Sequence, residues 1–94
     1  MVDMNATPAE SEDATAEEAR LDAALGAEVR AMRARHGWTQ EALAEATGYN
    51  KKTIARLEHG ERAMTVTQLY KICRAFGIRP SELVGAAEKE VGIQ

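Results

Sequence analysis

Apolar residues recur along this chain at intervals of three and four, the spacing that places side chains on one face of an α-helix. Two stripes of this kind are complete: Leu21, Leu25, Val29 and Met32 in the first half of the chain, and Leu69, Ile72, Cys73 and Phe76 in the second. No segment carries the signal of a β-strand. The pattern therefore predicts an all-α protein.

Capping residues and glycines divide the chain into five predicted helices. Ser, Thr, Asp and Asn favour helix N-termini, and glycine adopts the left-handed conformation that ends many helices. The helices are predicted over about residues 15–36, 39–47, 50–59, 65–76 and 80–85, the last ending near Gly85 or one turn later. Gly26 weakens the first helix by about 1 kcal/mol relative to Ala, so that helix starts at Thr15 or as late as Leu21. Short loops between amphipathic helices predict a compact five-helix bundle.

The length of 94 residues allows one domain. Residues 1–14 contain few bulky apolar side chains, one proline and two clusters of acids, and we expect them to form a disordered acidic tail. The folded domain is then expected over residues 15–87, and residues 88–94 are expected to fray.

Residues 39–60 hold two short predicted helices that meet at a glycine, the layout of a helix-turn-helix. Ala44 is small at the place where the two helices cross closely. Gly48 lies at the turn, where a left-handed backbone favours a residue without Cβ. Ile54 and Leu57, three residues apart, give the second helix its buried side. Such a unit inserts its second helix into the DNA major groove, so residues 39–60 predict DNA binding.

The second helix of this unit carries its basic residues on one face. Lys52 and Arg56 lie one turn apart, with Lys51 beside them, on the side opposite Ile54. Ala55 keeps this face low, so that long side chains can reach guanine O6 and N7. A solvated basic face is the commoner fate of a Lys-Lys pair, but the turn geometry favours DNA contact.

Phosphate contacts are predicted on either side of that helix. Thr39 and Gln40 lie at a helix N-terminus, where free N–H groups and the helix dipole attract phosphate, and capping by Thr39 is compatible with this role. Arg62 follows Gly60 and is a further phosphate candidate, although exposed loop arginines are ordinary.

The net charge of −3 hides an uneven distribution. Residues 1–22 hold seven acids and one base, a charge of −6, whereas the other 72 residues hold 11 Lys and Arg against eight acids, a charge of +3. The folded part is therefore basic, which permits nucleic-acid binding without proving it.

From about Leu25 to Leu83 the chain resembles the Xre/Cro-type helix-turn-helix family of bacterial and phage repressors, whose DNA-binding domains are lambda-repressor-like. The resemblance is carried by Q-E-A-L-A from Gln40, by G-Y-N-K-K-T-I-A-R-L-E-H-G from Gly48, and by the capped helix T-V-T-Q-L-Y-K-I-C-R-A-F-G from Thr65. It covers roughly two thirds of the chain through several independent motifs.

The resemblance implies roles for individual residues. Arg33 and Glu58 match a pair that forms a salt bridge between the first helix and the recognition helix, and Gln40 matches a residue that holds the DNA backbone. The candidate DNA contacts, from spacing and resemblance together, are Thr39, Gln40, Asn50, Lys51, Lys52, Thr53, Arg56 and Arg62. Two departures reduce the expected phosphate contacts after Gly60. Glu61 and Ala63 leave Arg62 as the one basic side chain there, and Met64 stands where the family often has proline.

Other classes of protein find no support in the sequence. No nucleophile–base pair, carboxylate dyad or phosphate-binding loop is present, so we predict neither an enzyme nor a small-molecule substrate or cofactor. His36, His59 and the single Cys73 lack the spacing of metal ligands, and Cys73 falls on an apolar face as a core thiol. No apolar run approaches the ~20 residues of a membrane span, and we expect a cytoplasmic protein.

The leading hypothesis is a sequence-specific DNA-binding transcriptional regulator, and specifically a repressor, that acts as a homodimer on a two-fold operator. The main alternative is a protein-interaction module, above all an antitoxin that binds a toxin and autoregulates through DNA, because the acidic start of the chain is suited to folding on a partner. A third possibility is that the acidic tail folds over the basic face as a DNA mimic; a tail that only aids solubility is the simpler interpretation.

Overall fold

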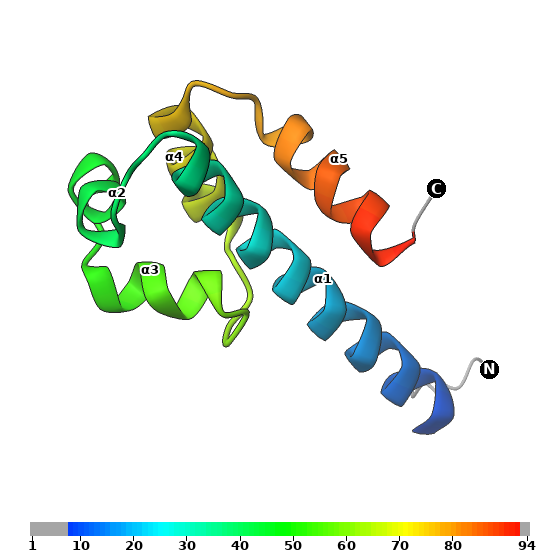
Figure 1. Cartoon of the computed structure of the whole chain (residues 1–94). Helices are drawn as coiled ribbons and strands as arrows, with labels where there is room; N and C mark the ends of the chain where they lie inside the picture. Colours follow the sequence, from blue (N-terminus) through cyan, green and yellow to red (C-terminus); the bar gives the residue numbers. More distant parts are fainter. Residues whose placement is uncertain (1–7, 93–94) are drawn as a thin grey trace.

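The computed structural model describes residues 8–92, which form five α-helices and no strand. The helices are α1 (Pro8–Arg35), α2 (Gln40–Thr47), α3 (Lys51–Glu58), α4 (Val66–Phe76) and α5 (Pro80–Val91), shown in Figure 1. The all-α, five-helix prediction is confirmed. No helix within the described residues is both long and apolar enough to cross a membrane.

One core joins all five helices. Its largest fully buried side chains are Val29, Leu43, Ile54, Leu57, Ile72, Cys73 and Leu83. Each fully buried aliphatic side chain contributes about 1.5–3 kcal/mol to folding, so these contacts fix how the short helices α2 and α3 sit on the rest. The rings of Trp38 and Phe76 lie 5.3 Å apart and extend the core under the loop between α1 and α2.

The first helix starts earlier than predicted. The helix was expected to begin at Thr15 or as late as Leu21, but α1 begins at Pro8, so residues 8–14 of the expected disordered tail are helical. Residues 1–7 of that tail lie outside the described residues. Proline is well tolerated in the first turn of a helix, and the following Ala and Glu residues have high helix propensity.

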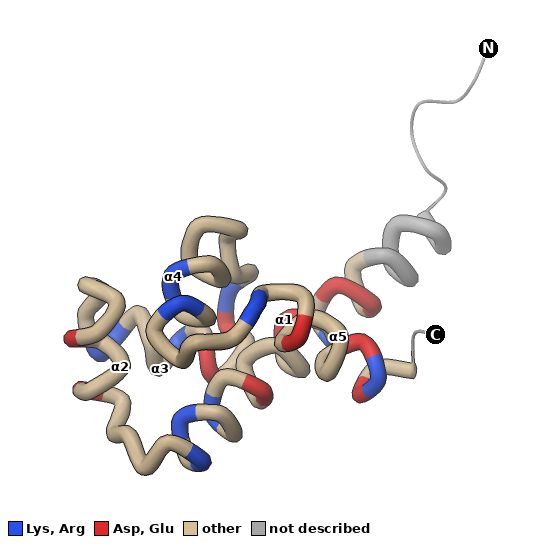
Figure 2. The backbone as a smooth tube through the Cα atoms, turned by 90° about the horizontal axis from the view of Figure 1, so that it is seen from above, with Lys and Arg blue, Asp and Glu red and all other residues tan. Residues whose placement is uncertain are grey.

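The described start of α1 extends away from α2 and α3 rather than across them (Figure 1). Glu17 and Glu18 are exposed on this part of the helix, and acidic residues are visible there in Figure 2. This arrangement gives no support to a tail that covers the basic face of the same chain.

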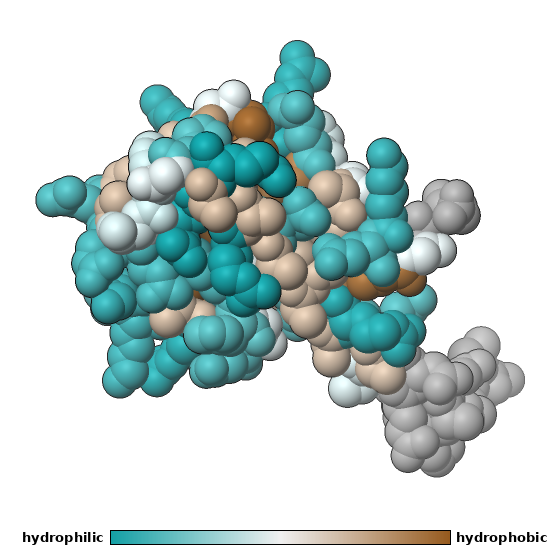
Figure 3. Space-filling view, in the orientation of Figure 1, coloured by the Kyte–Doolittle hydropathy of each residue, from teal (hydrophilic) through white to brown (hydrophobic). Residues whose placement is uncertain are grey.

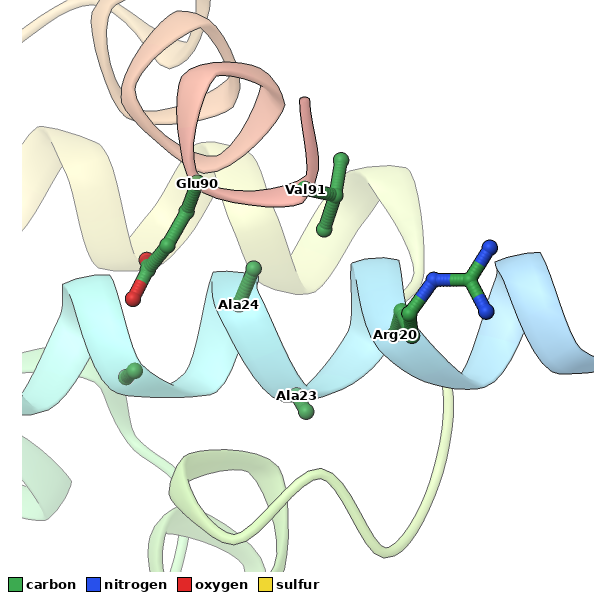
Figure 4. Close-up of a pocket in the computed structure, with 6 residues that line it drawn as sticks. Arg20, Ala23, Ala24, Glu90 and Val91 are labelled. Carbon is green, nitrogen blue, oxygen red and sulfur yellow. The ribbon is translucent and has the colours of Figure 1, made fainter. Parts of the chain in front are cut away.

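The last helix runs further than predicted. Fraying was expected from residue 88, yet α5 continues to Val91 and ends at Gly92, whose φ is 83°. Ala87 is fully buried and Val91 packs against the core, so burial against α1 stabilises the final turns. Beside this crossing lies a surface hollow of about 450 Å³, shown in Figure 4 and lined by Arg20, Ala23, Ala24, Ala27, Glu90 and Val91.

The same helix α1 packs closely against the end of α3 through a glycine. A Cβ atom on Gly26 would lie 2.3 Å from the carbonyl oxygen of Leu57 and 2.6 Å from that of Glu58. The helix-weakening residue of α1 is therefore the one that lets the backbone of α3 approach it. This contact sets the position of α3 and, with it, of the candidate DNA-binding face.

Candidate nucleic-acid interface

Helices α2 and α3 form a helix-turn-helix whose turn is defined by local capping. The side chain of Thr39 accepts a hydrogen bond of 3.0 Å from the backbone N–H of Ala42 at the start of α2. Gly48 ends α2 with a φ of 83°, and its N–H donates to the carbonyl of Ala44. Asn50 Oδ1 then accepts from the N–H of Thr53 at 2.8 Å and starts α3. Only three residues separate the two helices, which fixes the angle between them.

The recognition helix α3 has one buried and one exposed side. Ile54 and Leu57 are buried, whereas Lys51 and Lys52 are exposed at the start of the helix. Arg56 is half-buried one turn after Lys52. Figure 3 shows that hydrophilic side chains cover this part of the molecule, and Figure 2 shows Lys and Arg on α3, on α4 and at the end of α1. The basic face predicted from spacing is accessible to a large ligand.

A buried carboxylate ties three helices together beneath this face. Glu58 accepts two hydrogen bonds from Arg33, 2.7 Å from Nε and 3.1 Å from Nη2, and a third of 3.0 Å from Gln40 Nε2. Arg33 Nη1 also donates to the carbonyl oxygen of Trp38 at 3.0 Å. This is the α1–α3 pair that the resemblance implies, extended to the start of α2. Glu58 is almost fully buried, and these hydrogen bonds offset the free-energy cost of removing its charge from water.

The electrostatics of this cluster favour a fixed geometry. The hydrogen bond that Arg33 donates to Glu58 raises the pKa of the Arg33 guanidinium further, and burial opposes this only in part. The guanidinium is planar and bidentate, so it holds α1 and α3 in one relative orientation. Gln40 donates one amide N–H to the same carboxylate, so the start of α2 is tied to this pair as well.

One exposed ion pair at the interface involves a residue that sequence reasoning missed. Lys51 Nζ lies 3.0 Å from Glu41 Oε2, joining the starts of α3 and α2, and both side chains are more than half exposed. The Lys51 ammonium group, and next a hydrogen bond from the backbone N–H of Glu41 itself, lower the pKa of Glu41. No local pattern identifies this pair, because the two residues meet only when the turn brings the helix starts together.

Arg62 stands apart from the other candidate contacts. It is exposed in the loop after Gly60, at the C-terminal end of α3, whereas Asn50, Lys51 and Lys52 lie at the N-terminal end. An eight-residue helix is about 12 Å long, so Arg62 and Asn50 can reach only separate phosphates or bases.

His36 and Cys73 have structural surroundings. The ring of His36 packs edge-on against Trp38 and tilted against Phe76, at 5.6 and 5.0 Å between centroids. Cys73 is a buried free thiol, and burial raises its pKa to about 11. In the described part of the chain, no group of three His, Cys, Asp or Glu side chains is placed to hold a metal ion.

The geometry of α2 and α3 on a helical core defines a DNA-binding helix-turn-helix domain. Residues 29–83 match the helix-turn-helix family model, and the chain belongs to that family. Among curated proteins, it is 33% identical over 61 residues to the uncharacterized HTH-type transcriptional regulator YgzD of Bacillus subtilis, covering 65% of this chain and 92% of that protein. It is 34% identical over 64 residues to the competence pilus inhibition repressor of Acinetobacter baylyi, covering 68% of this chain and 58% of that protein.

Solved structures show the same fold. The clp gene regulator ClgR of Corynebacterium glutamicum superimposes with a TM-score of 0.74 at 31% identity, over 79% of this chain and 96% of that one. The restriction-modification controller protein C.AhdI of Aeromonas hydrophila gives a TM-score of 0.63 at 30% identity, over 65% of this chain and 92% of that one. The protein is thus a DNA-binding transcriptional regulator of the Xre/Cro type and not an enzyme, as predicted.

Proposed function

We propose that this chain is a sequence-specific repressor that inserts α3 into the DNA major groove. The carrying observation is the two-sided recognition helix, with Ile54 and Leu57 buried and Lys51 and Lys52 exposed. The Glu58 network holds that helix against α1 and α2, so the exposed face is presented in a fixed orientation. Repression is supported by similarity to a repressor in Acinetobacter baylyi.

The proposed contacts divide into base readers and phosphate anchors. Lys52 and Arg56 read guanine edges, because Lys and Arg pair well with O6 and N7 in the major groove. Asn50, Lys51 and Thr53, at the start of α3, contact base edges or flanking phosphates. The phosphate anchors are Thr39 and Gln40 at the N-terminus of α2, and Arg62 beyond the C-terminal end of α3.

A homodimer on a two-fold operator is part of this proposal. One recognition helix of eight residues reads only a few base pairs, whereas two copies on half-sites one helical turn apart, about 34–36 Å, read enough to be selective. We place this activity in the cytoplasm, where the DNA of a bacterial or archaeal cell lies.

A protein partner, such as a toxin, stays a prediction from the acidic start of the chain. Glu17 and Glu18 are exposed on α1 and are available to such a partner. A small protein that co-purifies in stoichiometric amount with the natively expressed chain would identify it.

The decisive experiment is selection of bound duplexes from a random pool, followed by titration of the selected and a scrambled duplex at moderate salt. The proposal expects a selected consensus with two-fold symmetry and guanines at the contacted positions, bound at least 10³-fold more tightly than the scrambled duplex. Equal affinity for the two duplexes would contradict sequence-specific binding.

A further inference from the structure

Glu41 places a negative charge inside the basic candidate interface. Its carboxylate lies 3.0 Å from the ammonium group of Lys51, and the two side chains are 65% and 56% exposed. Glu41 is also the residue after Gln40, in the first turn of α2. The carboxylate therefore sits next to two of the proposed DNA contacts, one through space and one along the chain.

The position of Glu41 matches what a DNA phosphate would require. Free backbone N–H groups in the first turn of a helix attract anions, and a lysine beside them adds a positive charge. The carboxylate of Glu41 interacts with both groups: with Lys51, and with its own backbone N–H, both of which lower its pKa. A phosphate arriving at the start of α2 meets partners that are already occupied.

We propose that Glu41 is an internal competitor of DNA phosphate, which holds Lys51 in the free protein and on random DNA and is displaced when the protein binds its selected duplex. This inference rests on the proposed function, because it assigns a role within the same interface. It makes Glu41 a specificity-determining residue that acts through Lys51 and need not touch DNA.

The competitor affects random and selected DNA differently. Binding to random sequence depends almost entirely on phosphate contacts. Glu41 weakens these contacts, because it pairs with Lys51 and because its carboxylate repels the phosphate. Binding to the selected duplex also includes contacts with base edges, which Glu41 does not oppose. Glu41 therefore lowers affinity for random DNA more than for the operator and widens the ratio between them.

The test compares Glu41→Gln with wild type in titrations of a scrambled duplex and of the selected duplex across a range of salt concentrations. Because exposed ion pairs are weak, we expect Glu41→Gln to bind the scrambled duplex about two- to fivefold more tightly. The freed lysine adds about one phosphate contact, so the slope of log affinity against log salt steepens by about 0.9. The ratio of selected to scrambled affinity falls.

Two controls separate this role from a general change in charge. Glu45→Gln removes the same charge from an exposed position on the same helix, and we expect a smaller gain and a wild-type salt slope. In a Lys51→Gln background, Glu41→Gln should lose most of its effect. An equal gain in Glu41→Gln and Glu45→Gln, or no gain in Glu41→Gln, overturns the inference.

The same titrations distinguish this inference from the proposed function. If wild type does not prefer the selected duplex, both fail. If wild type prefers it and Glu41→Gln behaves as wild type, only the competitor role fails. Thermal unfolding of each variant, followed by circular dichroism, verifies that the fold is unchanged, as expected for exposed side chains.

Discussion

Replacement of Gly26 by Ala gives the sharpest test of how α3 is positioned, because local and tertiary effects have opposite signs. In the interior of a helix, Ala is more favourable than Gly by about 0.8–1.0 kcal/mol. Gly26 lies well inside α1 and does not have a positive φ. Helix propensity alone therefore predicts a more stable protein.

The packing of α1 against α3 reverses this expectation. The new methyl group would lie 2.3 Å from the Leu57 carbonyl oxygen and 2.6 Å from the Glu58 carbonyl oxygen, about 1 Å closer than an ordinary contact of about 3.5 Å. Both atoms belong to the backbone, so no side-chain rotation relieves the overlap. Overpacking of this kind costs about 1–3 kcal/mol, and the rigid surroundings place Gly26→Ala at the upper end. After the gain in propensity, we expect a net loss of about 1–2 kcal/mol.

The measurement is urea and thermal unfolding followed by circular dichroism. A loss of 1–2 kcal/mol lowers the melting temperature of a domain of this size by roughly 5–15 °C. The matched control is Gly85→Ala in α5, where the added methyl group meets nothing within 4 Å and the expected change is a gain of up to about 1 kcal/mol. If Gly26→Ala stabilises the protein as much as Gly85→Ala does, the proposed close contact between α1 and α3 is wrong.

Three further predictions concern the interface and the core. Arg56→Ala should reduce the preference for the selected duplex. Gln40→Ala should instead weaken binding to all duplexes alike and reduce the slope of log affinity against log salt. Equal effects of the two substitutions on specificity would contradict the division into base readers and phosphate anchors. Glu58→Ala leaves the guanidinium of Arg33 without its carboxylate partner and should lower the free energy of unfolding by about 3–5 kcal/mol. Urea titration measures this loss, and an unchanged midpoint would disprove it. Cys73, with its pKa raised to about 11, should react with iodoacetamide at pH 8 far more slowly in the folded than in the unfolded protein. Above about pH 8.5 the thiol ionises in the unfolded protein, whereas in the folded protein it stays protonated until the pH approaches 11. The contribution of Cys73 to the free energy of unfolding is therefore fully present below about pH 8.5 and is lost as the pH rises towards 11. We expect Cys73→Ala to be less sensitive to alkaline pH.

The helix boundaries around the turn were readable because capping involves atoms only a few residues apart. Thr39 and Asn50 bond to N–H groups three residues later, and Gly48 adopts the positive φ that its place in the sequence indicates. The outer ends of α1 and α5 were misjudged for the opposite reason. Their extent depends on propensity over several turns at Pro8 and on burial of Ala87 against another helix.

The candidate interface divides in the same way. The basic face of α3 follows from helical spacing, and the Arg33–Glu58 pair came from a family resemblance and not from any local pattern. The hydrogen bond from Gln40 to Glu58 and the ion pair between Glu41 and Lys51 were not anticipated. They join residues 18 and 10 positions apart, and their geometry depends on how the helices cross.

By itself, the sequence determined the five helices, the turn between α2 and α3, and the side of α3 that is buried, because these depend on periodicity and on short-range capping. Only the tertiary structure decided what Gly26 is for and which partners Glu58 and Glu41 have. Each of these depends on contacts between atoms of different helices, which no spacing along one helix encodes. The basic face proposed to meet DNA is thus specified locally, and its orientation and the ion pair of Lys51 with Glu41 are set by packing.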